Sequence, residues 1–136
     1  MGRERLAESL VVSYLPEPES HPLWNGIKEL LRPANGEIPG EDELVWIAFD
    51  GPTLFGAGTT VLYDSGEASI LACGGFQHRK WVAQAERLVS AWARDCGATK
   101  LTMRGRRGWA RYFRALGWDA SKIGDEWIYE KELARG

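Results

Sequence analysis

The sequence has few of the residues that bind metals or cross-link small secreted domains. Only two of its 136 residues are cysteines and two are histidines. Cys73 lies in an apolar run and Cys96 in a helical pattern, and neither belongs to a CxxC motif or a Cys/His cluster. We therefore expect no metal site and two buried free thiols, a pattern typical of a reducing compartment.

A positive charge excess and long apolar runs are also missing. The formal net charge is −2, so any contact with nucleic acid would have to come from a local basic patch. Residues 1–20 contain no apolar run long enough for a signal peptide or a membrane span. These absences predict a soluble protein that does not bind membranes and is either intracellular or carried inside a particle.

Large apolar side chains are plentiful. Hydrophobic residues make up 44% of the sequence and seven residues are tryptophan, enough to build one core for a single domain over residues 1–136. Helical spacing predicts helices at 22–31, 79–96 and 108–116, and residues 32–43 have the composition of an exposed loop. Strand patterns occupy the remaining segments, at 8–15, 44–50, 54–63, 67–76, 99–105 and 127–133. This order predicts an α/β (α+β) domain with a mixed, mostly antiparallel sheet, one long helix and two short ones.

Two stretches resemble the GNAT superfamily of acyl-CoA-dependent N-acetyltransferases. They are AERLVSAWARDCGATKLTM (85–103) and RYFRALGW (111–118), and the resemblance in element order extends over residues 8–133. In that family a Q/R-x-x-G-x-G/A loop opens the main helix. The free N–H groups and positive dipole end of such a helix bind pyrophosphate, and the glycines let the phosphates approach the backbone.

The resemblance implies a set of cofactor-binding positions. Arg79 matches the first motif position, while Val82 and Gln84 stand where small residues are expected. Because a β-branched side chain at 82 would crowd the phosphates, we expect the loop to be degenerate and acyl-CoA not to bind. The full set of implied positions is Cys73, Gly74, Arg79, Lys80, Val82, Ala83 and Gln84.

The catalytic positions also depart from the family pattern. The family's closing phrase carries a tyrosine that protonates the departing thiolate, and Phe113 falls on that position here. Phenylalanine has no proton to give, so Tyr112 becomes the candidate acid. Glu67 is the candidate base on the strands before the helix, although a solvated turn residue is the alternative. Whether the chain is an enzyme is left open.

Five arginines form the densest basic group of the chain. The apolar residues Trp109, Phe113 and Leu116 share one helical face, which predicts that they pack into the core. The arginines are then either a binding face for DNA, CoA phosphates or an acidic protein surface, or simply the solvated side of an amphipathic helix. They are Arg104, Arg106, Arg107, Arg111 and Arg114.

These departures favour a non-catalytic GNAT-like protein. The phrase GRRGW (105–109) is similar to small GNAT-like proteins of tailed phages, which implies a virion component or assembly factor with protein partners, in the host cytoplasm or the virion. The first alternative is an active N-acyltransferase using acetyl-CoA, and the second is nucleic-acid binding through the arginines. The cleft between the third and fourth main strands separates the first two hypotheses. An open and basic cleft favours the active enzyme, and a cleft filled by tryptophan favours the non-catalytic protein.

Overall fold

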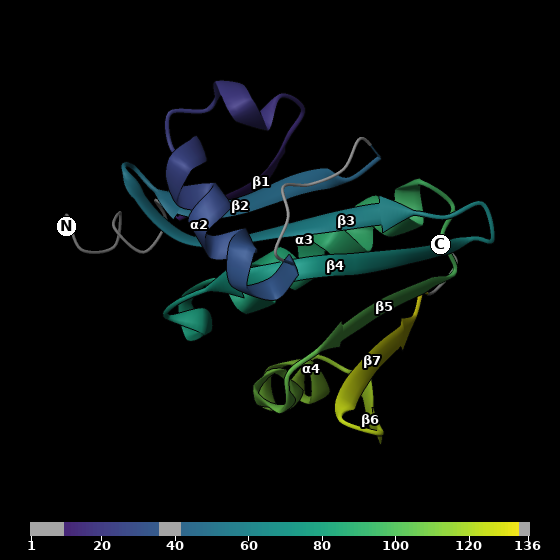
Figure 1. Cartoon of the computed structure of the whole chain (residues 1–136). Helices are drawn as coiled ribbons and strands as arrows, with labels where there is room; N and C mark the ends of the chain where they lie inside the picture. Colours follow the sequence, from purple (N-terminus) through teal and green to yellow (C-terminus); the bar gives the residue numbers. More distant parts are fainter. Residues whose placement is uncertain (1–9, 36–41, 134–136) are drawn as a thin grey trace, which may run out of the picture.

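The computed structural model describes residues 10–35 and 42–133. Their centre is one seven-stranded sheet in the order β1-β2-β3-β4-β5-β7-β6 (Figure 1). The strands are β1 (Val11–Leu15), β2 (Leu44–Asp50), β3 (Thr53–Leu62), β4 (Glu67–Gly75), β5 (Lys100–Gly105), β6 (Asp119–Ile123) and β7 (Glu126–Glu132). Every neighbouring pair is antiparallel except β4 and β5, which are parallel. The predicted α+β class and mixed sheet are therefore confirmed.

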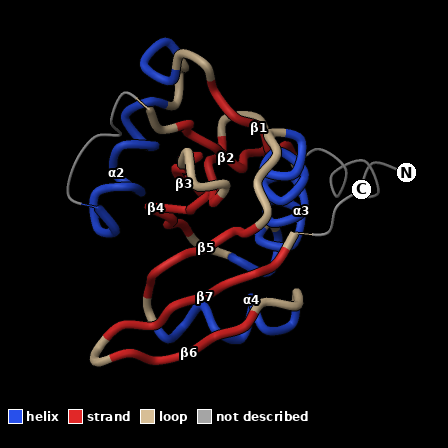
Figure 2. The backbone as a smooth tube through the Cα atoms, turned by 90° about the vertical axis from the view of Figure 1, so that its right-hand side faces the viewer, coloured by secondary structure: helices blue, strands red, loops and turns tan. Residues whose placement is uncertain are grey.

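Helices cover both faces of this sheet, as Figure 2 shows. Helix α2 (Trp24–Asn35) packs Ile27 and Leu31 on one face. Helices α3 (Val82–Asp95) and α4 (Ala110–Ala115) cover the other face and bury the main core. Short 3-10 turns precede each helix, at Pro18–Ser20, His78–Lys80 and Arg107–Trp109.

The largest departures from the predicted elements are the end of helix α2 and the presence of strand β6. Helix α2 continues through Pro33 to Asn35, so the predicted loop at 32–43 begins later, and residues 36–41 lie outside the described part. The proline removes one hydrogen bond near the helix end, where packing of the earlier turns already holds the backbone. Strand β6 was not predicted because its sequence, DASKI, is almost entirely exposed and lacks apolar alternation.

Strand β4 contains one extra residue at the point where its pairing with β5 ends. Thr59 pairs with Ala72 and Thr60 pairs with Ile70, which leaves Leu71 without a partner on β3 as a β-bulge. The parallel ladder between β4 and β5 covers only Glu67–Ile70 and stops at this bulge. Beyond it the two strands diverge, as Figure 1 shows.

A buried polar network connects the two halves of the sheet on either side of this divergence. Glu86 of α3 accepts hydrogen bonds from the Trp118 indole at 2.9 Å and the Ser90 hydroxyl at 3.2 Å, and it pairs with the Lys131 ammonium of β7. The side chain of Glu86 is 4% exposed. Since a buried carboxylate needs such partners, the network fixes α3 relative to β7.

Candidate functional site: the cleft between β4 and β5

An open cleft of about 520 Å³ occupies the space where β4 and β5 diverge. The strand wall on one side is β4 after the bulge, and the other wall comes from the end of β5 and the start of α4. The lining residues are Glu29, Leu30, Leu71, Ala72, Cys73, Gly74, Gly75, His78, Met103, Arg104, Gly105, Arg106, Gly108, Trp109, Arg111 and Tyr112. The cleft is therefore open and carries three arginines, Arg104, Arg106 and Arg111, together with Glu29.

Trp109 lines the cleft without filling it, and Trp81 lies outside it. Trp81 is 4% exposed and packs against β3, where a Cβ on Gly56 would lie 2.4 Å from its ring. Its indole nitrogen donates to the Phe76 carbonyl at 2.9 Å. Gly75 must also be glycine, because it adopts φ +151° and a Cβ there would lie 2.3 Å from the Phe55 carbonyl.

The two neighbouring aromatics of α4 separate into cleft and core. Phe113 is 3% exposed and packs on Trp118 and Tyr129, with ring centroids 4.9 and 5.7 Å away. Tyr112 is half-buried and lines the cleft. The candidate acid chosen from the sequence thus reaches the cleft, and Phe113 serves the core.

His78 faces Tyr112 from the opposite wall. Their ring centroids are 5.6 Å apart, and the His78 ring also contacts Trp109 at 4.9 Å and Trp81 at 5.6 Å. Burial, followed by the positive charge of Arg111, lowers the pKa of His78 below its ordinary value of 6.5. The imidazole is consequently neutral at neutral pH and able to accept a proton.

The predicted arginine face is divided between two regions. Arg104, Arg106 and Arg111 line the cleft, whereas Arg114 places its guanidinium over the Trp127 ring at 5.6 Å. Arg104 also pairs with Glu126 at 3.7 Å, and both side chains are exposed. Arg107 is exposed and is not among the lining residues. Three of the five arginines therefore line the cleft, and Arg107 and Arg114 do not.

The start of α3 places the implied cofactor residues on different sides. Val82 is 4% exposed and belongs to the core with Val12 and Ala48, so its side chain does not crowd the outer surface of the helix. Ala83 is exposed and Gln84 is half-buried. The β-branched side chain therefore points into the core, whereas the sequence interpretation placed it against the phosphates.

The cations beside this helix remain at the surface. Arg79 and Lys80 are exposed in the 3-10 turn, and the Lys80 ammonium lies 5.3 Å from the Phe55 ring centroid. Helix α3 has no side-chain N-cap and no acidic residue in its first turn. Its free N–H groups are thus surrounded by positive charge, an arrangement that favours a bound anion.

Cys73 and Gly74 both line the cleft, as the resemblance implied. Burial raises the pKa of the Cys73 thiol to about 12, so this sulfur stays protonated and is a poor nucleophile. Cys96 is exposed, which corrects the prediction that both thiols are buried; both are free.

Glu67 is not part of the cleft. It begins β4, opposite Lys100, whereas the cleft starts four residues later at Leu71. The strand rise of ~3.3 Å per residue places it roughly 13 Å from that point. The candidate base chosen from the sequence therefore lies away from Tyr112, and His78, which was not among the candidate catalytic residues, lies in the cleft.

Two features are absent from residues 10–35 and 42–133. None of their helices is both long enough and apolar enough to pass through a bilayer. No three of their histidine, cysteine, aspartate and glutamate side chains gather in a way that would hold a metal ion.

Comparison with solved structures identifies the fold. A GNAT family acetyltransferase from Elizabethkingia anophelis with acetyl-CoA bound superposes with a TM-score of 0.71 at 13% identity, over 93% of this chain and 99% of that one. A Bacillus subtilis acetyltransferase in complex with CoA gives a TM-score of 0.69 at 12% identity, over 92% and 99% of the two chains. An IAA acetyltransferase from Bacillus cereus gives 0.66 at 16% identity, over 92% and 100%.

The fold is that of the GNAT acetyltransferases. No family model matches the sequence, and no curated protein matches it. The agreement with the GNAT fold is therefore structural.

Proposed function

We propose that this chain is an acyl-CoA-dependent N-acyltransferase that uses the β4–β5 cleft. The observation that carries the proposal is a proton acceptor and a proton donor facing each other in an open cleft. The His78 and Tyr112 rings lie 5.6 Å apart, and both line the cleft. Two solved structures with the same fold contain CoA or acetyl-CoA.

The residues present fit an acyl-CoA. After the bulge, residues 71–75 have no β5 partner, so their outward backbone groups are available to an extended amide-containing arm. Arg79 and Lys80 stand beside the uncapped start of α3, where a pyrophosphate would meet both side-chain charge and free N–H groups. Arg104, Arg106 and Arg111 supply further cations in the cleft itself.

His78 and Tyr112 carry out the two proton transfers of the reaction. An amine nitrogen attacks the thioester carbonyl, so that a C–N bond forms and the C–S bond breaks. The proton lost by the amine passes to neutral His78, and the phenol of Tyr112 supplies the proton that the departing thiolate takes up. His78 is poised for its part because its pKa is lowered, which leaves the imidazole unprotonated.

Neither the structure nor the comparisons support a phage or virion role. The non-catalytic hypothesis depended on crowding at Val82 and on loss of the acid at Phe113. Val82 is in the core and Tyr112 lines the cleft, so both reasons lose their force. Binding of nucleic acid by one arginine face is weakened by the separation of Arg114 from the cleft arginines.

Titration calorimetry with acetyl-CoA, followed by thiol release with a panel of small amines, tests the proposal. We expect micromolar binding, weakened at least tenfold by Arg79→Ala, with Arg107→Ala as the matched exposed control. Tyr112→Phe should retain binding and lose at least tenfold in turnover, in line with the usual contribution of a positioned acid. Absence of acetyl-CoA binding at millimolar concentration and low salt would overturn the proposal.

A further inference from the structure

The cleft between β4 and β5 is lined from both faces of the sheet. His78 and Tyr112 come from the face that α3 and α4 cover, whereas Leu30 belongs to α2 on the opposite face. Under the proposed function, the phosphates of an acyl-CoA lie beside Arg79 and Lys80 at the start of α3. The α2 side of the cleft therefore remains for the acceptor amine.

Strand β5 directs one arginine to the α2 side of the sheet. Leu101 and Met103 pack in the main core beneath α3 and α4, and side chains alternate along a strand, so Arg104 lies on the opposite face. There it pairs with Glu126 at 3.7 Å, but both side chains are exposed and such a pair contributes little. Arg104 thus adds positive charge to this side of the cleft, partly balanced by Glu126.

Arg106 follows β5 directly, and the core holds its backbone in place. Its carbonyl accepts a hydrogen bond at 2.6 Å from the phenol of Tyr129, which is fully buried. Two of the neighbouring lining residues, Gly105 and Gly108, have no side chain to occupy the cleft. The exposed side chain of Arg106 therefore has open space beside a fixed backbone.

Arg111 stands beside both groups of the proposed proton transfers. Its guanidinium carbon lies 5.2 Å from the centroid of the Tyr112 ring. Burial, followed by the charge of Arg111, lowers the pKa of His78, so this charge acts on the imidazole as well. An anion held by Arg111 would consequently lie next to the reacting groups.

The positive charge of Arg106 and Arg111 is not balanced by an ion pair within the described part of the chain. Among the described lining residues of the cleft, Glu29 is the only acid and stands against three arginines. A guanidinium presents a planar fork of N–H donors that fits the oxygens of a carboxylate or a phosphate. The cleft is therefore suited to an oxyanion close to its reacting centre.

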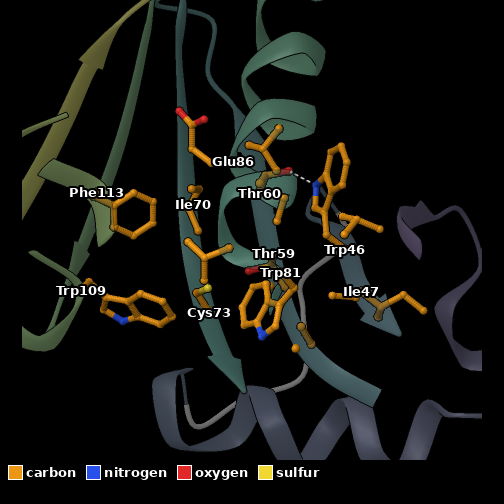
Figure 3. A pocket seen from close by; sticks show the side chains of 18 residues that line it. Trp46, Ile47, Thr59, Thr60, Ile70, Cys73, Trp81, Glu86, Trp109 and Phe113 are labelled. Carbon is orange, nitrogen blue, oxygen red and sulfur yellow. Dashed lines mark hydrogen bonds between the residues drawn. The ribbon is translucent and has the colours of Figure 1, made fainter. Parts of the chain in front are cut away.

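A smaller cavity of about 50 Å³, between α3 and strands β2, β3 and β4, offers no such partner (Figure 3). None of its described lining residues is a lysine, an arginine or a histidine. Its charged lining residue is Glu86, a buried carboxylate that already pairs with Lys131. An oxyanion would be repelled there, so a charged acceptor belongs in the cleft.

We propose that the acceptor is a small primary amine that also carries an oxyanion, either a carboxylate or a phosphate, which Arg106 and Arg111 bind in the cleft. The inference rests on the proposed function and deepens it by naming the class of acceptor. Holding the oxyanion orients the molecule, so that its amine nitrogen meets the thioester carbonyl between His78 and Tyr112. Arg104 strengthens the positive field on the side from which the acceptor enters.

Thiol release from acetyl-CoA with three matched amines tests the inference. The amines are 2-aminoethanol, 3-aminopropionate and 2-aminoethyl phosphate, which share the same two-carbon spacing between nitrogen and polar group. Charge-assisted hydrogen bonds should raise kcat/KM for the preferred oxyanion amine about tenfold or more above that of 2-aminoethanol. The larger of the two oxyanion values shows whether the site takes a carboxylate or a phosphate.

Variants of the arginines test which side chains create the preference. Arg106→Gln and Arg111→Gln should each lower the ratio of kcat/KM between the oxyanion amine and 2-aminoethanol, and the double variant should bring it close to one. Arg107→Gln is the matched control, because Arg107 is an exposed neighbour that does not line the cleft. All amines are compared at one saturating acetyl-CoA concentration, so an arginine that bound only CoA phosphates would change every rate alike.

The outcomes separate this inference from the proposed function. If acetyl-CoA does not bind, the proposed function fails. If acetyl-CoA binds and neither oxyanion amine reacts faster than 2-aminoethanol, the proposed function stands and the acceptor class is overturned. If the preference persists in the double variant, its assignment to Arg106 and Arg111 is overturned. The measurements on the unmodified protein need no variant, so a folding defect in one of them leaves the acceptor class decided.

Discussion

His78 and Trp109 pack edge to face across the cleft, with ring centroids 4.9 Å apart and ring planes at 79°. His78 belongs to the turn before α3 and Trp109 to the turn before α4. The two walls of the cleft therefore contact each other through His78, whose imidazole can gain or lose a proton. Any change in the charge of His78 alters the environment of the proposed proton donor Tyr112, whose ring it also contacts.

The stability of the protein should therefore depend on pH through His78. Its folded-state pKa is lowered below 6.5, so the unfolded chain takes up the proton first as the pH falls. The stabilising effect of the neutral ring is present above about pH 6.5 and is lost as the pH decreases through that value. The melting temperature should fall less between pH 7.5 and 5.5 in His78→Phe than in the unmodified protein. His21→Gln is the control, and equal pH dependence in all three proteins would contradict the assignment.

Breaking the network at Glu86 should destabilise the fold strongly. Lys131→Met leaves a buried carboxylate without its ammonium partner, which costs about 3–5 kcal/mol. Adding Glu86→Gln removes the uncompensated charge and should recover part of that loss. Chemical denaturation measures both, with Arg104→Ala as a comparison because its ion pair is exposed and contributes at most ~1 kcal/mol. Equal losses for Lys131→Met and Arg104→Ala would show that the network is not stabilising.

A methyl group at Gly56 should disturb the packing of Trp81. The added Cβ would lie 2.4 Å from the indole ring, which must move from its place in the core. Overpacking of this kind costs about 1–3 kcal/mol. Gly108→Ala is the control, since nothing lies within 4 Å of a Cβ there. Thermal unfolding should separate the two variants, and a similar melting temperature for both would contradict the close packing described.

The two cysteines should differ in reactivity. Burial raises the pKa of Cys73 to about 12, whereas Cys96 is exposed. Iodoacetamide at pH 8 should modify Cys96 in the folded protein and leave Cys73 intact, as measured by peptide mass spectrometry. Both should react once the protein is denatured. Rapid labelling of Cys73 in the folded state would contradict its burial.

Much of the fold could be predicted because its signals are local. Strand β2 follows the apolar run Leu44–Asp50 at the predicted boundaries, and the apolar stripe of α3 identified the main helix. Strand β6 carries no such signal, since pairing with β7 holds an almost fully exposed segment in place. Such pairing depends on where β7 lies in the assembled sheet, so the residues of β6 alone do not predict it.

The site was harder to predict than the fold. Family position placed Phe113 at the reacting centre, but the choice between Phe113 and Tyr112 depends on how far α4 is rotated about its axis. The direction of Val82 depends on the same kind of rotation in α3. His78 lies at the cleft because the turn before α3 contacts the turn before α4, about 30 residues away in the chain. No sequence pattern signals such a contact.

Because of the bulge at Leu71, the cleft depends more on the number of residues in β4 than on their side chains. Loss of that residue would leave Ala72 and Cys73 opposite their present partners Thr59 and Gly58, but it would remove the bulge at which the ladder between β4 and β5 stops and would let that ladder continue. Insertions and deletions of a single residue in β4 should consequently be far less tolerated in evolution than substitutions at the same positions.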